Sequence, residues 1–318
     1  MTPSIGLRTL ALLGVGVVAV SFAAPLMASL AVPALAIAFW RNALATAAIA
    51  PVVGWRVAHG DMRMSRAGLE STAPGAPATF ACPGARELGL VVLAGVCLAS
   101  HFGFWITSLG MTSVASSTAI VSLQVLWVVG YDVQRGEGAR AAVLVGVLLA
   151  VTGAVVVSGV DFSISARALA GDGLALLGSL GVAAYAVIGG RVRQTVSTSA
   201  YTLGCYGTAA LVLLVAALLS GQALTGYGAD QWLRLGVLAA TAQLLGHSVF
   251  NHLLATVSPM VVSLTILLEI PGAALIAAAW LGQVPEPVAF AGLGLILSGM
   301  AVVILASPPS AKSEAVVA

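Results

Sequence analysis

Ten apolar runs, each about as long as a lipid bilayer is thick, follow one another along this chain and constrain its fold more than any other feature. A membrane-spanning helix needs about 20 mostly apolar residues. On that scale the expected spans are residues 10–30, 34–53, 88–108, 113–131, 141–160, 171–189, 200–220, 232–254, 259–281 and 288–306. The sequence therefore predicts an all-α membrane protein with ten transmembrane helices.

The scarcity of charged side chains supports the same class. They make up 8% of the chain, against roughly a quarter in soluble domains, so most of the surface must face lipid. A net charge of +2 gives no reason to expect a nucleic-acid partner. The first apolar run is followed by further spans and not by a soluble body, so we interpret it as a retained helix and not as a cleaved signal peptide.

The distribution of Lys and Arg predicts the orientation. If the N-terminus is cytoplasmic, the inner loops and ends hold ten Lys and Arg residues, and the outer loops hold two, Arg167 and Arg234. Membrane proteins concentrate these residues on the cytoplasmic side. We therefore expect a multi-pass protein of the cell (inner) membrane with both ends in the cytoplasm. The long loop 54–87, rich in Pro, Gly and Ala, is expected to be cytoplasmic and mostly irregular.

The two halves of the sequence resemble each other. An offset of 145 residues lays Trp105–Leu109 on Phe250–Leu254 and Gln124 on Glu269. The match runs from the third to the fifth span against the eighth to the tenth. A five-helix unit crosses the membrane an odd number of times, so a second copy enters with the opposite orientation.

An offset of 146 residues lays two further pairs of small residues on each other in the fifth and tenth spans. Gly146 falls on Gly292, and Gly153 falls on Gly299. Each pair is seven residues apart, which is two turns along one helix face. Small faces of this kind permit close packing between membrane helices.

These repeats predict two inverted five-helix units. The expected division is a first repeat at 1–160, a second, inverted repeat at 161–306 and a cytoplasmic tail at 307–318. Inverted repeats are typical of secondary transporters, whose binding site lies near the bilayer midplane where the repeats meet.

Several motifs resemble EamA-type members of the drug/metabolite transporter superfamily. They include His101–Leu109 (HFGFWITSL), Gly246–Asn251 (GHSVFN) and Leu268–Leu275 (LEIPGAAL). The resemblance covers nearly the whole chain apart from the 57–86 loop and the C-terminal tail. It implies a ten-helix exporter of amino acids or related compounds. One departure is Val125, which stands where the family usually has a proline after the position of Gln124.

Two side chains of fixed charge type lie deep within predicted spans, where a charge is costly and is a functional candidate by default. They are Arg41 and Glu269. Glu269 has three interpretations: it binds a substrate ammonium group, it carries a coupling proton, or it pairs structurally with Arg41 or a histidine. Gln124, its counterpart in the first repeat, is expected at similar depth, so the two would form a symmetric polar pair.

Arg41 has two interpretations. We favour a structural role in which its guanidinium binds backbone carbonyls of neighbouring helices, and the alternative is that it binds a substrate carboxylate. His101 and His247 lie in the third and eighth spans at comparable depth, and are expected either to form interhelical hydrogen bonds or to line a cavity. Asn251 follows His247 by one helical turn and is expected on the same face.

Aromatic residues are expected to complete this site. Trp105 follows His101 by four residues and is the preferred aromatic wall, with Tyr185 as the second candidate. The histidines lack metal-ligand spacing, and the three cysteines are too scattered for a zinc site or a disulfide framework. We expect no metal and no cofactor.

The leading hypothesis is a secondary transporter that exports a small polar metabolite, such as an amino acid, or a drug across the inner membrane by alternating access. The alternative is a membrane-embedded enzyme acting on a lipid-linked substrate, for which the acidic residues of the loops show no pair at usable spacing. A passive channel would need a polar stripe along one helix, and no span has one. The expected partners are a small-molecule substrate and the lipid bilayer, with proton coupling as one open mechanism. Internal duplication leaves a monomer or a weak homodimer as expected states.

Overall fold

The computed structural model of the chain is helical apart from one short pair of strands. It describes residues 6–59, 62–64, 80–82, 84–112, 114–136, 141–158, 165–282 and 287–306. The elements are α1 (Leu7–Ser21), α2 (Ala23–Ala28), α3 (Ala34–Ala58), β1 (Met62–Met64), β2 (Phe80–Cys82), α4 (Ala85–Leu109), α5 (Val114–Val121), α6 (Gln124–Gln134), α7 (Ala141–Ser158), α8 (Ala166–Val192), α9 (Thr198–Leu219), α10 (Ala229–Leu238), the π-helix η2 (Ala239–His247), α11 (Ser248–Leu253), α12 (Pro259–Ile266), α13 (Glu269–Leu281) and α14 (Pro287–Ala306).

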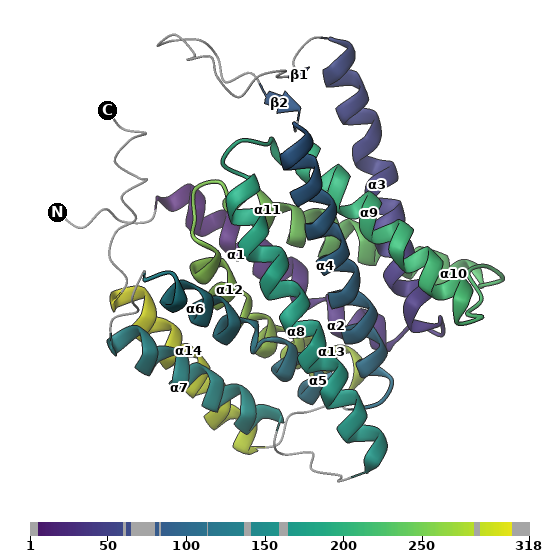
Figure 1. Ribbon diagram of the computed structural model, residues 1–318. Coiled ribbons are helices and arrows are strands. Elements are labelled where there is room, and N and C mark those ends of the chain that lie inside the picture. The colour runs from purple at the N-terminus through teal and green to yellow at the C-terminus, as the bar shows by residue number, and fades with distance from the viewer. Residues whose placement is uncertain are drawn as a thin grey trace.

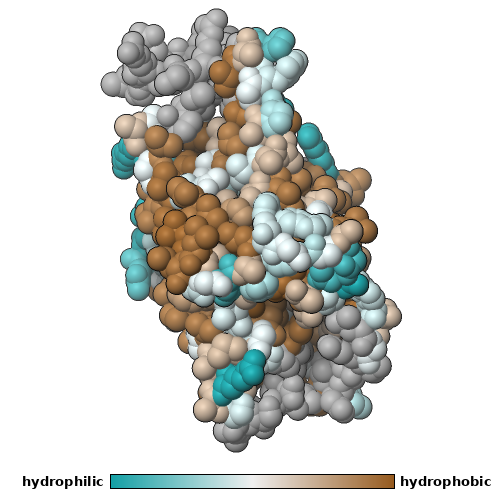
Figure 2. Space-filling model, turned by 90° about the vertical axis from the view of Figure 1, so that its right-hand side faces the viewer, coloured by the Kyte–Doolittle hydropathy of each residue, from teal (hydrophilic) through white to brown (hydrophobic). Residues whose placement is uncertain are grey.

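Each of the ten predicted spans coincides with a helix or with a run of consecutive helices. Within the described residues, eight of these runs are long and apolar enough to cross a membrane. The remaining two, α7 and α14, contain shorter apolar stretches, Ala141–Val156 and Phe290–Val303. The chain is therefore a multi-pass membrane protein. Figure 2 shows apolar side chains covering much of one face of the molecule.

The loop between α3 and α4 was expected to be mostly irregular, and most of residues 60–83 lie outside the described residues. It contains β1 and β2, which pair in parallel with Met62 opposite Phe80. The helices on either side also extend into the predicted loop, since α3 continues to Ala58 and α4 begins at Ala85. The predicted tail at 307–318 lies outside the described residues.

Helix ends follow from local side-chain chemistry. The hydroxyl groups of Ser165, Ser197 and Ser258 accept a backbone N–H in the first turns of α8, α9 and α12. Such caps satisfy donors that have no partner inside the helix. Pro259 occupies the first turn of α12, where a missing N–H has no cost. Gly282 ends α13 with a φ of 68°, in the left-handed region that favours glycine.

Two membrane helices are broken at corresponding places. α5 and α6 are separated by Ser122 and Leu123, and α12 and α13 by Leu267 and Leu268. The two breaks are 145 residues apart in sequence, the same offset that relates Gln124 to Glu269, so these two residues begin the second segments of the two helices.

The proline near the second break lies beyond it. Pro271 is the third residue of α13, in the first turn, where its lack of an N–H is tolerated. The N–H of Ile270 instead donates to the carbonyl of Leu267. The first break forms with Val125 in the place of the family's proline, and there Ser122 donates its hydroxyl to the carbonyl of Thr118. A proline is therefore not required for the break.

The helices pack in two main groups (Figure 1). α4 packs against α8 and α9, and α3 packs against α9. α7 and α14 pack chiefly against each other and lie side by side at the lower left of the view. α1 packs against η2, α11 and α13, so it joins the N-terminal part of the chain to the C-terminal part.

Glycines set the distance between α7 and α14. A Cβ atom added at Gly146 would lie 2.7 Å from the carbonyl oxygen of Gly299. A Cβ atom added at Gly153 would lie 2.7 Å from the amide nitrogen of Ile296 and would also contact the carbonyl oxygen of Gly292. Both glycine pairs predicted to pack closely therefore do so, against one another. Gly146, early in α7, meets Gly299, late in α14, and Gly153, late in α7, meets Gly292, early in α14. The two helices therefore run antiparallel.

Replacing Gly153 with alanine is therefore expected to destabilise the protein by about 1–3 kcal/mol, because the added methyl group meets backbone atoms that cannot move aside alone. Thermal unfolding of the purified protein in detergent measures this effect. Gly294 on α14 is the matched control, since a Cβ at that position would meet no atom within 4 Å. Equal melting temperatures for Gly153→Ala and Gly294→Ala would show that the glycine contact is not tight.

Candidate functional site

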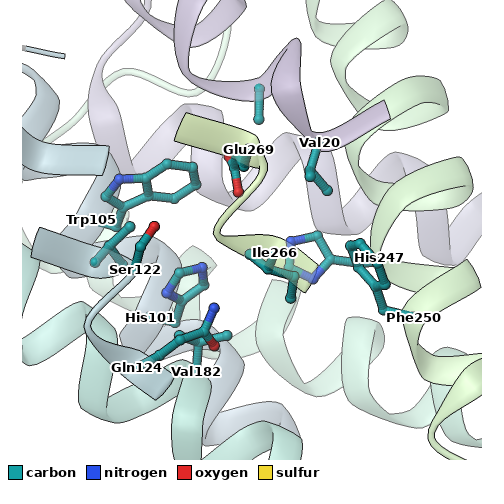
Figure 3. A pocket seen from close by; sticks show the side chains of 12 residues that line it. Val20, His101, Trp105, Ser122, Gln124, Val182, His247, Phe250, Ile266 and Glu269 are labelled. Carbon is teal, nitrogen blue, oxygen red and sulfur yellow. The ribbon is translucent and has the colours of Figure 1, made fainter. Parts of the chain in front are cut away.

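A small cavity lies where the broken helices meet α4, α8 and η2. It leaves about 30 Å³ for the centres of water-sized molecules, which is room for about two waters. Its walls come from α1, α2, α4, α5, α6, α8, η2, α11, α12 and α13. The lining residues are Val20, Ala23, His101, Trp105, Val121, Ser122, Gln124, Val182, His247, Phe250, Ile266 and Glu269. Figure 3 shows these side chains around a common space.

Glu269 is the carboxyl group of this cavity. It is the first residue of α13 and is 7% exposed. Its Oε1 atom is buried and has no hydrogen-bond partner. The N-terminus of a helix carries a partial positive charge and favours a carboxylate, but α13 supplies only that diffuse field. The carboxyl group therefore has unused capacity for a hydrogen-bond donor.

Gln124 holds the corresponding place on the other broken helix. It is the first residue of α6, it is buried and it lines the same cavity. Its Oε1 atom also lacks a hydrogen-bond partner. The predicted pair of polar groups at related positions therefore shares one cavity, with an amide on one side and a carboxyl group on the other.

His101 and Trp105 form one wall. Their rings stack with centroids 5.4 Å apart. The Nδ1 of His101 lies 3.0 Å from the carbonyl oxygen of Gly178. A carbonyl only accepts, so Nδ1 donates, and in the neutral imidazole Nε2 is left as an acceptor. The indole Nε1 of Trp105 is a buried donor without a partner. His247 stands across from this wall, 6.3 Å from His101 between ring centroids.

Arg41 lies behind the cavity and is not among its lining residues. It is fully buried on α3, and its Nε donates to Oε1 of Gln243 at 2.8 Å. Its guanidinium carbon lies 3.9 Å from the ring centroid of Phe102, and that ring in turn meets His247 edge-on at 5.2 Å. The favoured structural interpretation is consistent with this setting, although the tie is to side chains and not to the backbone carbonyls that we expected.

Tyr185 and Asn251 also lie outside the cavity lining. The hydroxyl of Tyr185 donates to Oδ1 of Asn251 at 2.6 Å, and Nδ2 of Asn251 lies 3.3 Å from the hydroxyl of Tyr206. Asn251 therefore faces α8 and α9. Phe250, three residues after His247, contributes the aromatic ring on that side of the cavity. The structure thus gathers five of the eight predicted residues around one space and places Arg41, Tyr185 and Asn251 outside its lining.

Sequence reasoning left out several lining residues. Phe250 and Ile266 could have been found, because the offset of 145 places them on Trp105 and Val121, which also line the cavity. Ser122 marks the first helix break. Val20 and Ala23 come from α1 and α2, and their apolar side chains give no sequence signal inside an apolar run.

A second group of contacts joins the two halves, between the α2–α3 connection with the first turns of α3 and the α9–α10 connection with the start of α10. The indole of Trp40 donates to the carbonyl of Leu224 at 2.7 Å and meets Trp232 edge-on at 4.8 Å. The backbone N–H of Ala31 donates to Oε1 of Gln231 at 2.9 Å. The N–H of Leu35 donates to Gln222 in the same way. We name these contacts the Trp40 latch.

No group of three or more His, Cys, Asp or Glu residues within the described ranges is placed to hold a metal ion. Among the acidic residues, Asp172 accepts a hydrogen bond from Ser116 at 3.0 Å, and Asp230 accepts one from Gln231. These carboxyl groups are thus engaged with neighbouring side chains and do not line the cavity.

One comparison with known proteins concerns the second half of the chain. Residues 169–305 match the model of the EamA-like transporter family, which confirms the predicted resemblance in the part of the chain that holds Gly246–Asn251 and Leu268–Leu275. No curated protein matches the chain. A solved structure titled "Crystal structure of protein" superposes with a TM-score of 0.70 at 16% sequence identity, and the match covers 94% of this chain and 97% of that one. At this identity the likeness concerns the fold alone.

Proposed function

We propose that this chain is a secondary transporter that exports a small polar metabolite, such as an amino acid, or a drug by alternating access. The match of residues 169–305 to the model of the EamA-like transporter family supports the proposal. The observation that carries the proposal is the cavity between the two broken helices, with an unpaired carboxyl group and an amide at corresponding positions.

Three pairs of lining residues support an internal inverted repeat. At the offset of 145, Trp105 corresponds to Phe250, Val121 to Ile266 and Gln124 to Glu269, and all six line the cavity. A cavity lined by residues and their own counterparts is expected on the axis that would relate two such repeats. Secondary transporters place their substrate site at such an axis, often between discontinuous helices.

The contacts of α7 with α14 support the same symmetry. Gly146 meets Gly299, and Gly153 meets Gly292. At the offset of 146, Gly292 is the counterpart of Gly146, and Gly299 is the counterpart of Gly153. Each contact therefore joins one residue to the counterpart of the other, which is the pattern across a twofold axis. The antiparallel course of the two helices agrees with repeats of opposite orientation, and so with ten crossings in all.

The small volume of the cavity supports a mechanism with moving parts. A space for about two water molecules is too small for a metabolite, so a substrate enters only if the walls separate. Rocking of residues 1–160 against 161–306 would open the cavity on one side at a time. We place both ends and the loop 54–87 in the cytoplasm on the basis of the Lys and Arg distribution.

Counterflow into liposomes tests this function. Purified protein is reconstituted into vesicles that are preloaded with a mixture of unlabelled amino acids, and uptake of each labelled amino acid is followed, with protein-free vesicles as the control. We expect saturable uptake of at least one labelled solute in unchanged chemical form. Uptake that rises linearly with concentration would indicate a channel, and chemical conversion of a lipid-linked substrate by the same vesicles would favour the enzyme.

A further inference from the structure

The hydrogen-bonding balance of the cavity indicates what kind of group it is built to receive. Oε1 of Glu269 and Oε1 of Gln124 are buried acceptors without a donor, and Nε1 of Trp105 is a buried donor without an acceptor. His101 Nδ1 is committed to Gly178, which leaves Nε2 of the neutral ring as a further acceptor. A buried acceptor is costly to leave unpaired. Acceptors therefore outnumber donors in this lining, and the missing complement is a group rich in N–H donors.

The charge of the lining points in the same direction. The twelve lining residues include one carboxyl group and no lysine or arginine. An anionic cargo would face Glu269 without a fixed positive partner in the wall. Arg41 lies outside the lining, with its guanidinium on the ring of Phe102 and its Nε on Gln243, and its Nη2 has no hydrogen-bond partner. Its positive charge therefore acts on Glu269 through space and not from the cavity wall.

Aromatic rings complete the chemistry. Trp105 and His101 stack as one wall, and His247 and Phe250 stand on the other side. In Figure 3 the carboxyl group of Glu269 points into the space between the Trp105 and His247 rings. Faces of aromatic rings attract cations, and they also pack against flat apolar groups. The cavity thus combines one carboxyl group with a ring of aromatic surfaces.

We propose that the cargo is an organic monocation whose ammonium group binds Glu269 and whose flat apolar part lies between Trp105 and Phe250. This inference rests on the proposed transport function and narrows its substrate class. An ammonium group offers several N–H donors and a positive charge at once, so it meets both the unpaired acceptors and the carboxyl group.

Three indole compounds of similar size test the charge requirement. Tryptamine is a cation, tryptophol is neutral and indole-3-acetate is an anion at neutral pH. Binding of each labelled compound to the purified protein is measured by equilibrium dialysis. Hydrogen bonds to charged groups contribute about 1.5–3 kcal/mol, so we expect tryptamine to bind about 10- to 100-fold more tightly than the other two.

In the Glu269→Gln protein this preference for tryptamine should disappear. Glu87→Gln, a change at the start of α4 and outside the cavity lining, is the matched control and should keep it.

Each result has a defined meaning. Equal or tighter binding of indole-3-acetate, no binding of tryptamine to the unchanged protein, or full tryptamine binding by a folded Glu269→Gln protein overturns the proposal. The comparison of the three compounds on the unchanged protein needs no variant, so it stands even if Glu269→Gln fails to fold. Counterflow is repeated with tryptamine added to the preloaded mixture. Transport of a neutral or anionic solute without tryptamine transport would reject the cargo class and leave the transporter intact. Failure of every solute would reject the transport function itself.

Discussion

Changing Glu269 to glutamine is expected to lower transport by about 10- to 100-fold while the protein still folds. The factor follows from losing a hydrogen bond to a charged group, about 1.5–3 kcal/mol. Glutamine keeps the shape of the side chain but can neither carry the charge nor exchange a proton. The variant also makes the two corresponding positions alike, because Gln124 already presents an amide at the start of α6. Initial rates of counterflow in liposomes measure the effect.

The same variant separates the three interpretations of Glu269. If the carboxyl group has a structural partner, its replacement should lower the melting temperature as well as the flux. If it binds substrate or carries a proton, stability should be kept or should rise, because an unpaired buried carboxyl group is costly. Proton coupling is distinguished from cargo binding by the effect of an imposed pH gradient, to which the wild type would respond and the variant would not. A flux equal to that of the unchanged protein would remove Glu269 from the mechanism.

Cross-linking the Trp40 latch is expected to reduce transport to the level of protein-free vesicles. The change is Ala31→Cys together with Gln231→Cys, followed by a short thiol-reactive cross-linker. The backbone N–H of Ala31 lies 2.9 Å from Oε1 of Gln231, so the two thiols should be within reach. The latch joins the first half of the chain to the second, and the cavity is too small for a cargo unless the halves move. A reducible linker allows transport to be restored by reduction.

The matched controls for this experiment come from the same protein. Each variant with only one of the two added cysteines, treated in the same way, should keep its flux, which also tests the native Cys82, Cys97 and Cys205 as targets. The pair Gln194→Cys with Leu254→Cys lies within residues 161–306, where Gln194 donates to the carbonyl of Leu254 at 3.5 Å. That link should leave transport unchanged. Full transport by a cross-linked latch would show that the halves do not separate at this place.

Much of the helical layout could be predicted from residue chemistry alone. The ten apolar runs gave the helix positions, since a backbone in lipid must satisfy its hydrogen bonds within the segment and so forms a helix. The expected span 259–281 begins at the residue where α12 begins, and the spaced glycines marked the faces on which α7 and α14 meet. The offset of 145 paired Gln124 with Glu269, and both proved to begin the second segment of a broken helix.

The direction of individual side chains was less predictable. Asn251 was expected beside His247 in the cavity. Its side chain instead forms hydrogen bonds with the hydroxyl groups of Tyr185 and Tyr206, outside the cavity lining. The π-helix that ends at His247 also has no clear sequence signal. Helices that are apolar nearly all round carry little information about which face turns inward, so neighbouring helices decide it.

The sequence by itself determined which segments of this chain form apolar helices and which few polar groups must be accommodated among them, because both follow from hydropathy. Only the tertiary structure decided which of those polar groups meet. It placed Arg41 against Phe102 and Gln243 and left Oε1 of Glu269 facing an aromatic cavity without a hydrogen-bond partner. The reason is that buried polar groups are satisfied by neighbours from distant segments, and the packing of whole helices selects those neighbours.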